Sequence, residues 1–157
     1  MSMRFTTIFM IFTAFALIGS VLAADTDGVE VAIQPPIFIP ASNLTWTDLD
    51  PAGAPGVKVV DLWGDHQKGS FGALFRLPAG FAVPLHTHTH AMKVVFLSGT
   101  YLQSPEGKPE VRLPPGSYMM QPGGDYRHIT SCDASSDCVF FVESEGAFDL
   151  RPVVSSQ

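Results

Sequence analysis

Three histidines occupy alternate positions in one short segment, His86-Thr87-His88-Thr89-His90. If this segment is a β-strand, alternate side chains point to the same face, so residues 86, 88 and 90 lie on one side. Neutral imidazoles that converge from one face can bind a single divalent metal ion. The alternative interpretation is a solvent-exposed strand of His and Thr that binds no metal.

A third ligand is expected from another strand, because a single strand usually supplies two. His128 is the candidate, since it follows the Pro122-Gly123-Gly124 turn at the start of a later expected strand. His66 follows Gly64-Asp65 and is expected to be exposed in a loop. The sequence therefore predicts a metal site of His86, His88 and His128, with His90 as an alternative ligand or an acid/base group.

Short strands must position these residues. Past residue 28, β-branched and aromatic runs are interrupted by turn residues, many of them Pro and Gly, about every eight to twelve residues. The expected strands are residues 29–33, 57–63, 71–77, 82–88, 92–97, 110–113, 117–121, 127–131 and 139–143. Residues 47–49 are expected to form at most one helical turn. Many short strands with regular turns favour an all-β protein, an antiparallel sandwich or barrel.

The first histidine cluster resembles the first motif of the cupin superfamily, Gly-x5-His-x-His-x3–4-Glu-x6-Gly. Gly80, five intervening residues, His86-x-His88 and the later Gly99 follow its spacing. Met92 occupies the position of the family's glutamate ligand, and Lys93 follows it. Three interpretations stay open: the site uses three imidazoles, His90 takes the vacant place, or metal binding has been lost.

The segment around His128 resembles the second cupin motif, Gly-x5-Pro-x-Gly-x2-His-x3-Asn. Gly116, five residues and Pro122-x-Gly124 follow it, but Arg127 stands at the family's histidine position and His128 comes one residue later. One extra residue turns a side chain to the other face unless a bulge absorbs it. The two adjacent glycines favour such a bulge, so His128 is kept as the third ligand.

The resemblance covers roughly residues 44–150 and is to a group of exported single-domain cupins of poorly known function. It implies an antiparallel cupin-type jelly-roll β-barrel with a metal ion inside one mouth. It also implies a divalent metal cofactor (Fe, Mn, Zn, Ni or Cu) and assembly as a homodimer, which is common among members.

The N-terminal segment predicts export. An apolar run from Phe5 to Leu22 follows Arg4 and ends in Val21-Leu22-Ala23, which is typical of a signal peptide cleaved before Ala24. The expected organisation is a signal peptide at 1–23, an N-terminal arm at 24–43 and one cupin barrel at 44–157. A retained membrane anchor is the alternative, since 18 residues lie at the short end of spanning length.

Cys132 and Cys138 flank a polar turn and are expected to form a disulfide in an exported protein. The alternative is that Cys132 is a thiolate near the metal, because it lies where the cupin motif often has Asn.

The formal net charge of −6 argues against nucleic acid and anionic lipid as partners, so no membrane is expected after signal cleavage. A small molecule is the expected partner instead. Five polar side chains are candidates to hold an anionic or hydroxylated ligand near the metal: Arg76, Tyr118, Gln121, Tyr126 and Arg127.

Two functions are consistent with these residues. The first is a metal-dependent enzyme for a small molecule, with oxygenase-, isomerase- or lyase-type chemistry. The second is a non-catalytic cupin that binds or senses a metal or a small ligand with a degenerate metal site. Fold analogy cannot choose between them, since one fold hosts many functions.

Overall fold

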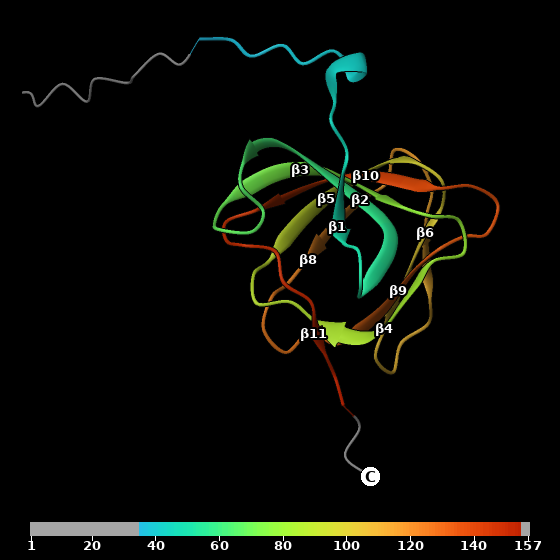
Figure 1. Cartoon of the computed structure of the whole chain (residues 1–157). Helices are drawn as coiled ribbons and strands as arrows, with labels where there is room; N and C mark the ends of the chain where they lie inside the picture. Colours follow the sequence, from blue (N-terminus) through green and yellow to red (C-terminus); the bar gives the residue numbers. More distant parts are fainter. Residues whose placement is uncertain (1–34, 155–157) are drawn as a thin grey trace, which may run out of the picture. The chain divides into compact units, whose positions relative to one another are not determined.

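The computed structural model describes residues 35–154. From Phe38 onward they form one compact unit of eleven strands with a short 3-10 helix, η1 (Ala41–Asn43) (Figure 1). The predicted signal peptide (1–23) and the predicted strand at 29–33 lie outside the described residues. Within residues 35–154, no helix has the length and apolar character needed to cross a membrane.

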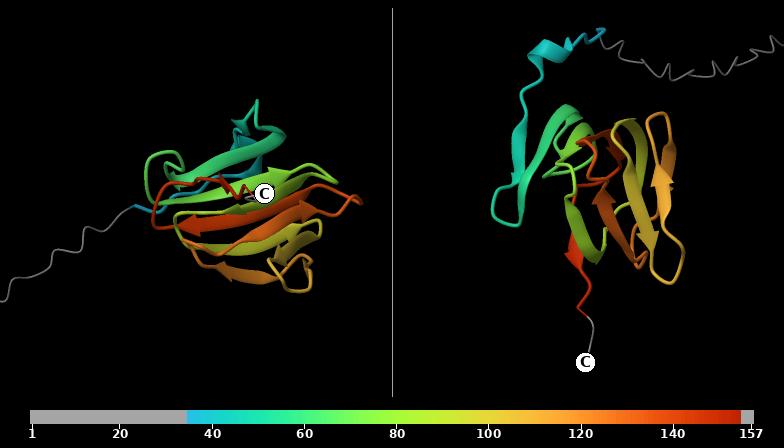
Figure 2. Two further views of the ribbon diagram at one scale, coloured as in Figure 1. Left: turned by 90° about the horizontal axis from the view of Figure 1, so that it is seen from below. Right: turned by 90° about the vertical axis from the view of Figure 1, so that its right-hand side faces the viewer.

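The strands form two antiparallel sheets that face each other (Figure 2). The six-stranded sheet has the order β1 (Thr47–Asp50), β2 (Ala54–Gly64), β3 (Phe71–Leu77), β10 (Cys138–Ser144), β5 (Met92–Ser98) and β8 (Tyr118–Gln121). The five-stranded sheet has the order β11 (Arg151–Pro152), β4 (Ala82–Thr87), β9 (His128–Cys132), β6 (Tyr101–Pro105) and β7 (Val111–Leu113). The predicted all-β, antiparallel class is confirmed.

The core lies between the sheets because side chains alternate along each strand. In β5, Met92, Val94 and Phe96 are buried while Lys93 and Val95 are exposed. Phe140 of β10 packs parallel to Phe75 of β3, with ring centroids 5.9 Å apart. A histidine or glutamine at an inward position of such a strand is therefore surrounded by apolar side chains.

Strands β1, β6 and β11 were not expected from the sequence, and β1 and β6 show why. Residues 47–49 belong to β1 and not to a helical turn, because Thr47 and Asp48 pair with Val59 and Lys58 of β2. Strand β6 was not predicted, since its sequence is polar and ends in Pro105. It forms because it pairs with both β9 and β7. Long-range pairing overrides weak local propensity in both cases.

Candidate metal centre

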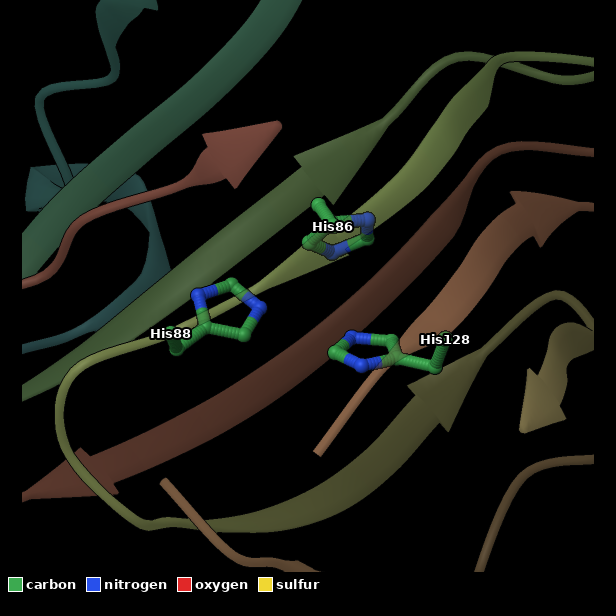
Figure 3. Close-up of side chains that lie close together, drawn as sticks. All are labelled: His86, His88 and His128. Atoms are coloured by element: carbon green, nitrogen blue, oxygen red, sulfur yellow. The ribbon is translucent and has the colours of Figure 1, made fainter. Parts of the chain in front are cut away.

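Strands β4 and β9 bring three histidines together (Figure 3). His86 lies directly opposite His128 in the β4–β9 ladder, and a register shift separates this pair from Val83 and Thr130. His88 lies just past the end of β4. The ring centroid of His86 is 4.2 Å from that of His128 and 4.9 Å from that of His88.

The three histidines offer ligand nitrogens that all lie within 4.8 Å of one another. All three side chains are buried, with 2%, 7% and 0% exposure for His86, His88 and His128. The structure thus places these predicted ligands in one buried cluster.

The extra residue before His128 is accommodated in the turn between β8 and β9. The β6–β9 ladder is regular from Tyr101–Cys132 to Pro105–His128, so no bulge is needed within β9. In the turn, Gly124 has a φ of +77°, which favours glycine, and its N–H donates to the carbonyl oxygen of His88 (2.8 Å). This hydrogen bond ties the turn before His128 to the loop after β4.

Each histidine of the cluster donates its Nδ1–H to a backbone carbonyl oxygen. The acceptors are Pro84 for His86 (2.7 Å), Asp149 for His88 (2.5 Å) and Tyr126 for His128 (3.2 Å). These bonds place the proton on Nδ1, so each Nε2 keeps a free lone pair. Such carbonyl partners orient metal-binding histidines in known metal sites.

Burial favours the neutral form of all three imidazoles. It lowers the pKa of His88 to about 4, against the opposing effect of the Asp149 carbonyl. It also lowers the pKa of His128 to about 4, with a further contribution from His86, and lowers the pKa of His86. The rings therefore stay deprotonated at Nε2 at neutral pH.

These residues fit a divalent metal ion. His128 Nε2 is fully buried and has no hydrogen-bond partner in the structure, which is costly for a polar atom unless something binds it. Three neutral imidazoles with their other nitrogens held by carbonyl groups form a donor set that Zn, Fe, Co, Ni or Cu accepts.

His90, the alternative ligand, lies outside the cluster. Its ring packs closely against Gly146: a Cβ added to this glycine would lie only 2.3 Å from His90 Nε2. Met92, at the family's glutamate position, is buried and lines a cavity together with His86 and His88. Lys93 points away from the site, where its Nζ pairs with Glu143 Oε1 at 2.8 Å.

The five side chains predicted to hold a ligand lie in different environments. Arg76 stacks over the Trp46 ring at 4.9 Å, Tyr118 is 59% exposed, and Arg127 lies 3.6 Å from Glu106. Tyr126 stacks on His128, with ring centroids 5.2 Å apart. Gln121 is buried and lines the cavity.

The prediction for His66 is wrong. This histidine is only 8% exposed, since its ring packs edge-on against Phe71 and its Nδ1 contacts the Asp61 carboxylate. The sequence signal was the preceding Gly64-Asp65 turn, which does not reveal a partner on the adjacent strand.

Cys132 and Cys138 form a disulfide with Cα atoms 5.8 Å apart, as predicted. It closes the turn between β9 and β10, so Cys132 offers no thiolate to the histidine cluster. The bridge joins the strand that carries His128 to the centre of the six-stranded sheet.

The two facing sheets form a cupin-type jelly-roll fold around the buried histidine cluster. The polyketide cyclase RemF from Streptomyces resistomycificus has the same fold, with a TM-score of 0.64 and 16% identity over 78% of this chain and 89% of that one. An RmlC-like cupin from Ralstonia eutropha matches with a TM-score of 0.60 and 20% identity, covering 77% of this chain and 78% of the other. A predicted oxalate decarboxylase from Thermotoga maritima matches with a TM-score of 0.56 and 22% identity, covering 70% of this chain and 99% of the other.

The chain belongs to the family described as a domain of unknown function, DUF4437, whose model matches residues 37–156. No curated protein matches the sequence. The TM-scores establish the shared fold and confirm the predicted cupin-type jelly roll.

Proposed function

We propose that this protein binds one divalent metal ion per chain through the Nε2 atoms of His86, His88 and His128. The observation that carries the proposal is the buried, unpartnered Nε2 of His128, in a cluster of three imidazoles that all carry their proton on Nδ1. A metal ion there supplies Lewis acidity and open coordination positions to a small molecule. The protein's own residues orient the ligands and exclude water.

We propose further that the small molecule occupies the cavity beside the cluster. The cavity has about 80 Å³ of space for the centres of water-sized molecules and lies among core side chains such as Val94, Phe140 and Phe148. This size suits a compound of a few heavy atoms. The activities named for the similar structures, a cyclase and a predicted decarboxylase, support small-molecule chemistry of this kind.

Binding without turnover is the second candidate. Among the described residues that line the cavity, none is Asp, Glu, Lys or Arg. A carboxylate or lysine general base is therefore missing from that lining, which favours a protein that holds a ligand without converting it.

Metal loading tests the proposal. Protein stripped with a chelator and reloaded with Zn(II) should retain about one ion per chain by mass spectrometry of the metal, and His128→Ala should retain almost none. His90→Ala is the matched control and should load like the wild type, because His90 lies outside the cluster. A wild type that stays metal-free would refute the site.

We also propose that the protein is exported, as the N-terminal sequence predicts. The Cys132–Cys138 disulfide supports this proposal, since such bridges persist in oxidising compartments. The intact mass of protein from the native compartment should correspond to a chain that begins at Ala24 and lacks two thiol hydrogens. A mass that includes residues 1–23 would argue for a retained anchor.

A further inference from the structure

A second buried polar atom without a partner belongs to Gln121, in the cavity that His86 and His88 also line. This side chain is 2% exposed and lines the same cavity as His86 and His88. Within residues 35–154, the buried polar side-chain atoms that lack a hydrogen-bond partner are two nitrogens, Gln121 Nε2 and His128 Nε2. An unpaired buried amide destabilises a fold, so its presence in the cavity wall suggests that it binds a ligand.

A chain of hydrogen bonds fixes the orientation of this amide. The Thr130 hydroxyl donates to Gln103 Oε1 (3.1 Å), and Gln103 Nε2 donates to Gln121 Oε1 (3.0 Å). Because the Thr130 proton is already used, the Tyr101 hydroxyl donates to Thr130 Oγ1 (3.0 Å). The donors therefore point in one direction, from Tyr101 through Thr130 and Gln103 to Gln121, and end on the free N–H groups of Gln121.

The reverse orientation of both amides is unfavourable. It would turn Gln103 Nε2 toward Thr130 Oγ1, and either the Thr130 or the Tyr101 hydroxyl hydrogen would then lose its acceptor inside the core. Burial raises the pKa of Tyr101 to about 12, so this hydroxyl keeps its proton and needs an acceptor. Linked hydrogen bonds of this kind also polarise one another, which strengthens the terminal donor.

The net charge of the site determines which kind of ligand can bind next to Gln121 Nε2. Three neutral imidazoles add no negative charge, and Met92 stands where the cupin motif has a glutamate. The described cavity lining contains no carboxylate either. A divalent ion held there keeps its double positive charge among apolar side chains, an arrangement that strongly favours an anionic ligand.

We propose that Gln121 is the recognition residue for a small carboxylate that binds to the metal centre. In this arrangement, which rests on the proposed metal site, one carboxylate oxygen faces the histidine cluster and the other accepts a hydrogen bond from Gln121 Nε2. Gln103, Thr130 and Tyr101 are positioning residues that act through Gln121. The Gln121 oxygen is occupied by Gln103, so Gln121 itself is not a metal ligand.

Acetate binding to the Co(II)-loaded protein tests this role, because the visible absorption of Co(II) reports changes in its ligands. The wild type should bind acetate in the presence of Co(II) and not in its absence. Gln121→Met, which keeps the side-chain length and removes the donor, should weaken acetate by about tenfold or more, as expected for a hydrogen bond to a charged group. Co(II) affinity should stay within about twofold, since no ligand changes. Gln67→Met, at an exposed glutamine, is the matched control and should change neither affinity.

Gln121→Glu provides a second variant that keeps the acceptor for Gln103 and hence the local fold. Its negative charge should abolish acetate binding while Co(II) stays bound. Unchanged acetate affinity in either variant would overturn the role of Gln121 while leaving the metal site intact. Failure of the wild type to bind Co(II) would instead refute the proposed metal site, so the two failures are distinguishable.

Discussion

Two clusters of potential metal ligands within residues 35–154 are equally compact but differ in whether their ligand atoms are free to bind a metal ion. His86, His88 and His128 form one, and Asp61, Asp65 and His66 form the other, each with ligand atoms within 4.8 Å. In the first, every Nδ1 is bonded to a carbonyl group and every Nε2 is free. In the second, His66 Nδ1 and the carboxylate oxygens of Asp61 and Asp65 already bind partners within the chain.

Hydrogen bonds from within the cluster and from neighbouring residues occupy these atoms of the second cluster. His66 Nδ1 lies 2.9 Å from one oxygen of Asp61 and 3.0 Å from the other. Asp65 accepts hydrogen bonds from Lys68 Nζ (2.6 Å) and from the Gln67 N–H (3.0 Å), and these lower its pKa. Proximity of ligand-type residues is therefore not sufficient for a site. A metal site also needs lone pairs that are buried, aligned and unpaired.

The largest expected effect is the loss of metal when the first cluster is removed. His86→Ala combined with His88→Ala should weaken Zn(II) by more than about 100-fold, since even loss of a supporting partner costs 10–100-fold. Asp61→Asn combined with Asp65→Asn should change Zn(II) affinity by less than about twofold. Competition with a chromophoric chelator measures both. Equal losses in the two double variants would show that the clusters do not differ as argued.

A smaller effect is expected from restoring the family's carboxylate. Met92→Glu places an anionic oxygen beside the first cluster and should tighten Mn(II) about tenfold or more, because hard ions prefer carboxylate to thioether ligands. His90→Glu is the control and should leave Mn(II) affinity unchanged. If Met92→Glu has no effect, residue 92 does not reach the metal despite its buried position in the cavity wall.

The sequence predicted the parts of this site that local patterns encode. Strand β3 was predicted with its observed bounds, because Phe71 to Leu77 lies between clear turn residues. His86 and His88 follow from period-two spacing, and His128 from its turn. The polar chain through Gln103 was not predictable, since its strand β6 was missed and its partner Gln121 comes from the opposite sheet.

The outward direction of Lys93 and the burial of His66 were also not predictable, because both depend on tertiary contacts. Lys93 follows the position of the family's glutamate ligand in the sequence, yet strand alternation turns its side chain toward Glu143. His66 depends on Asp61, five residues earlier, across the bend that follows β2. Local sequence identifies ligand types, whereas tertiary contacts decide which of their atoms stay free.

The metal-free protein should lose stability in mild acid. His88 and His128 have pKa values of about 4 in the folded state and about 6.5 when unfolded. Between these values the unfolded chain binds more protons, so stability falls as the pH drops from about 6.5 to 4. Thermal melts of the metal-free protein should give a Tm lower by about 5–10 °C at pH 4.5 than at pH 7. His88→Gln with His128→Gln should flatten this dependence, and an equally steep dependence in that variant would assign it to other groups.

The smallest expected effect concerns the turn that aligns the first cluster. A Cβ at Gly123 would lie 2.4 Å from the Thr89 carbonyl oxygen and 2.8 Å from the His90 carbonyl carbon, so Gly123→Ala must displace the loop that begins at His88. The displacement moves one ligand without removing it, and Zn(II) affinity should fall by about fivefold, less than for loss of a supporting hydrogen bond. Gly69→Ala, in the loop of the second cluster, is the matched control: its Cβ would meet nothing within 4 Å, so metal affinity and Tm should be unchanged. If Gly123→Ala binds Zn(II) like the wild type, the loop adjusts without moving His88, and alignment of the first cluster comes from β4 and β9 alone.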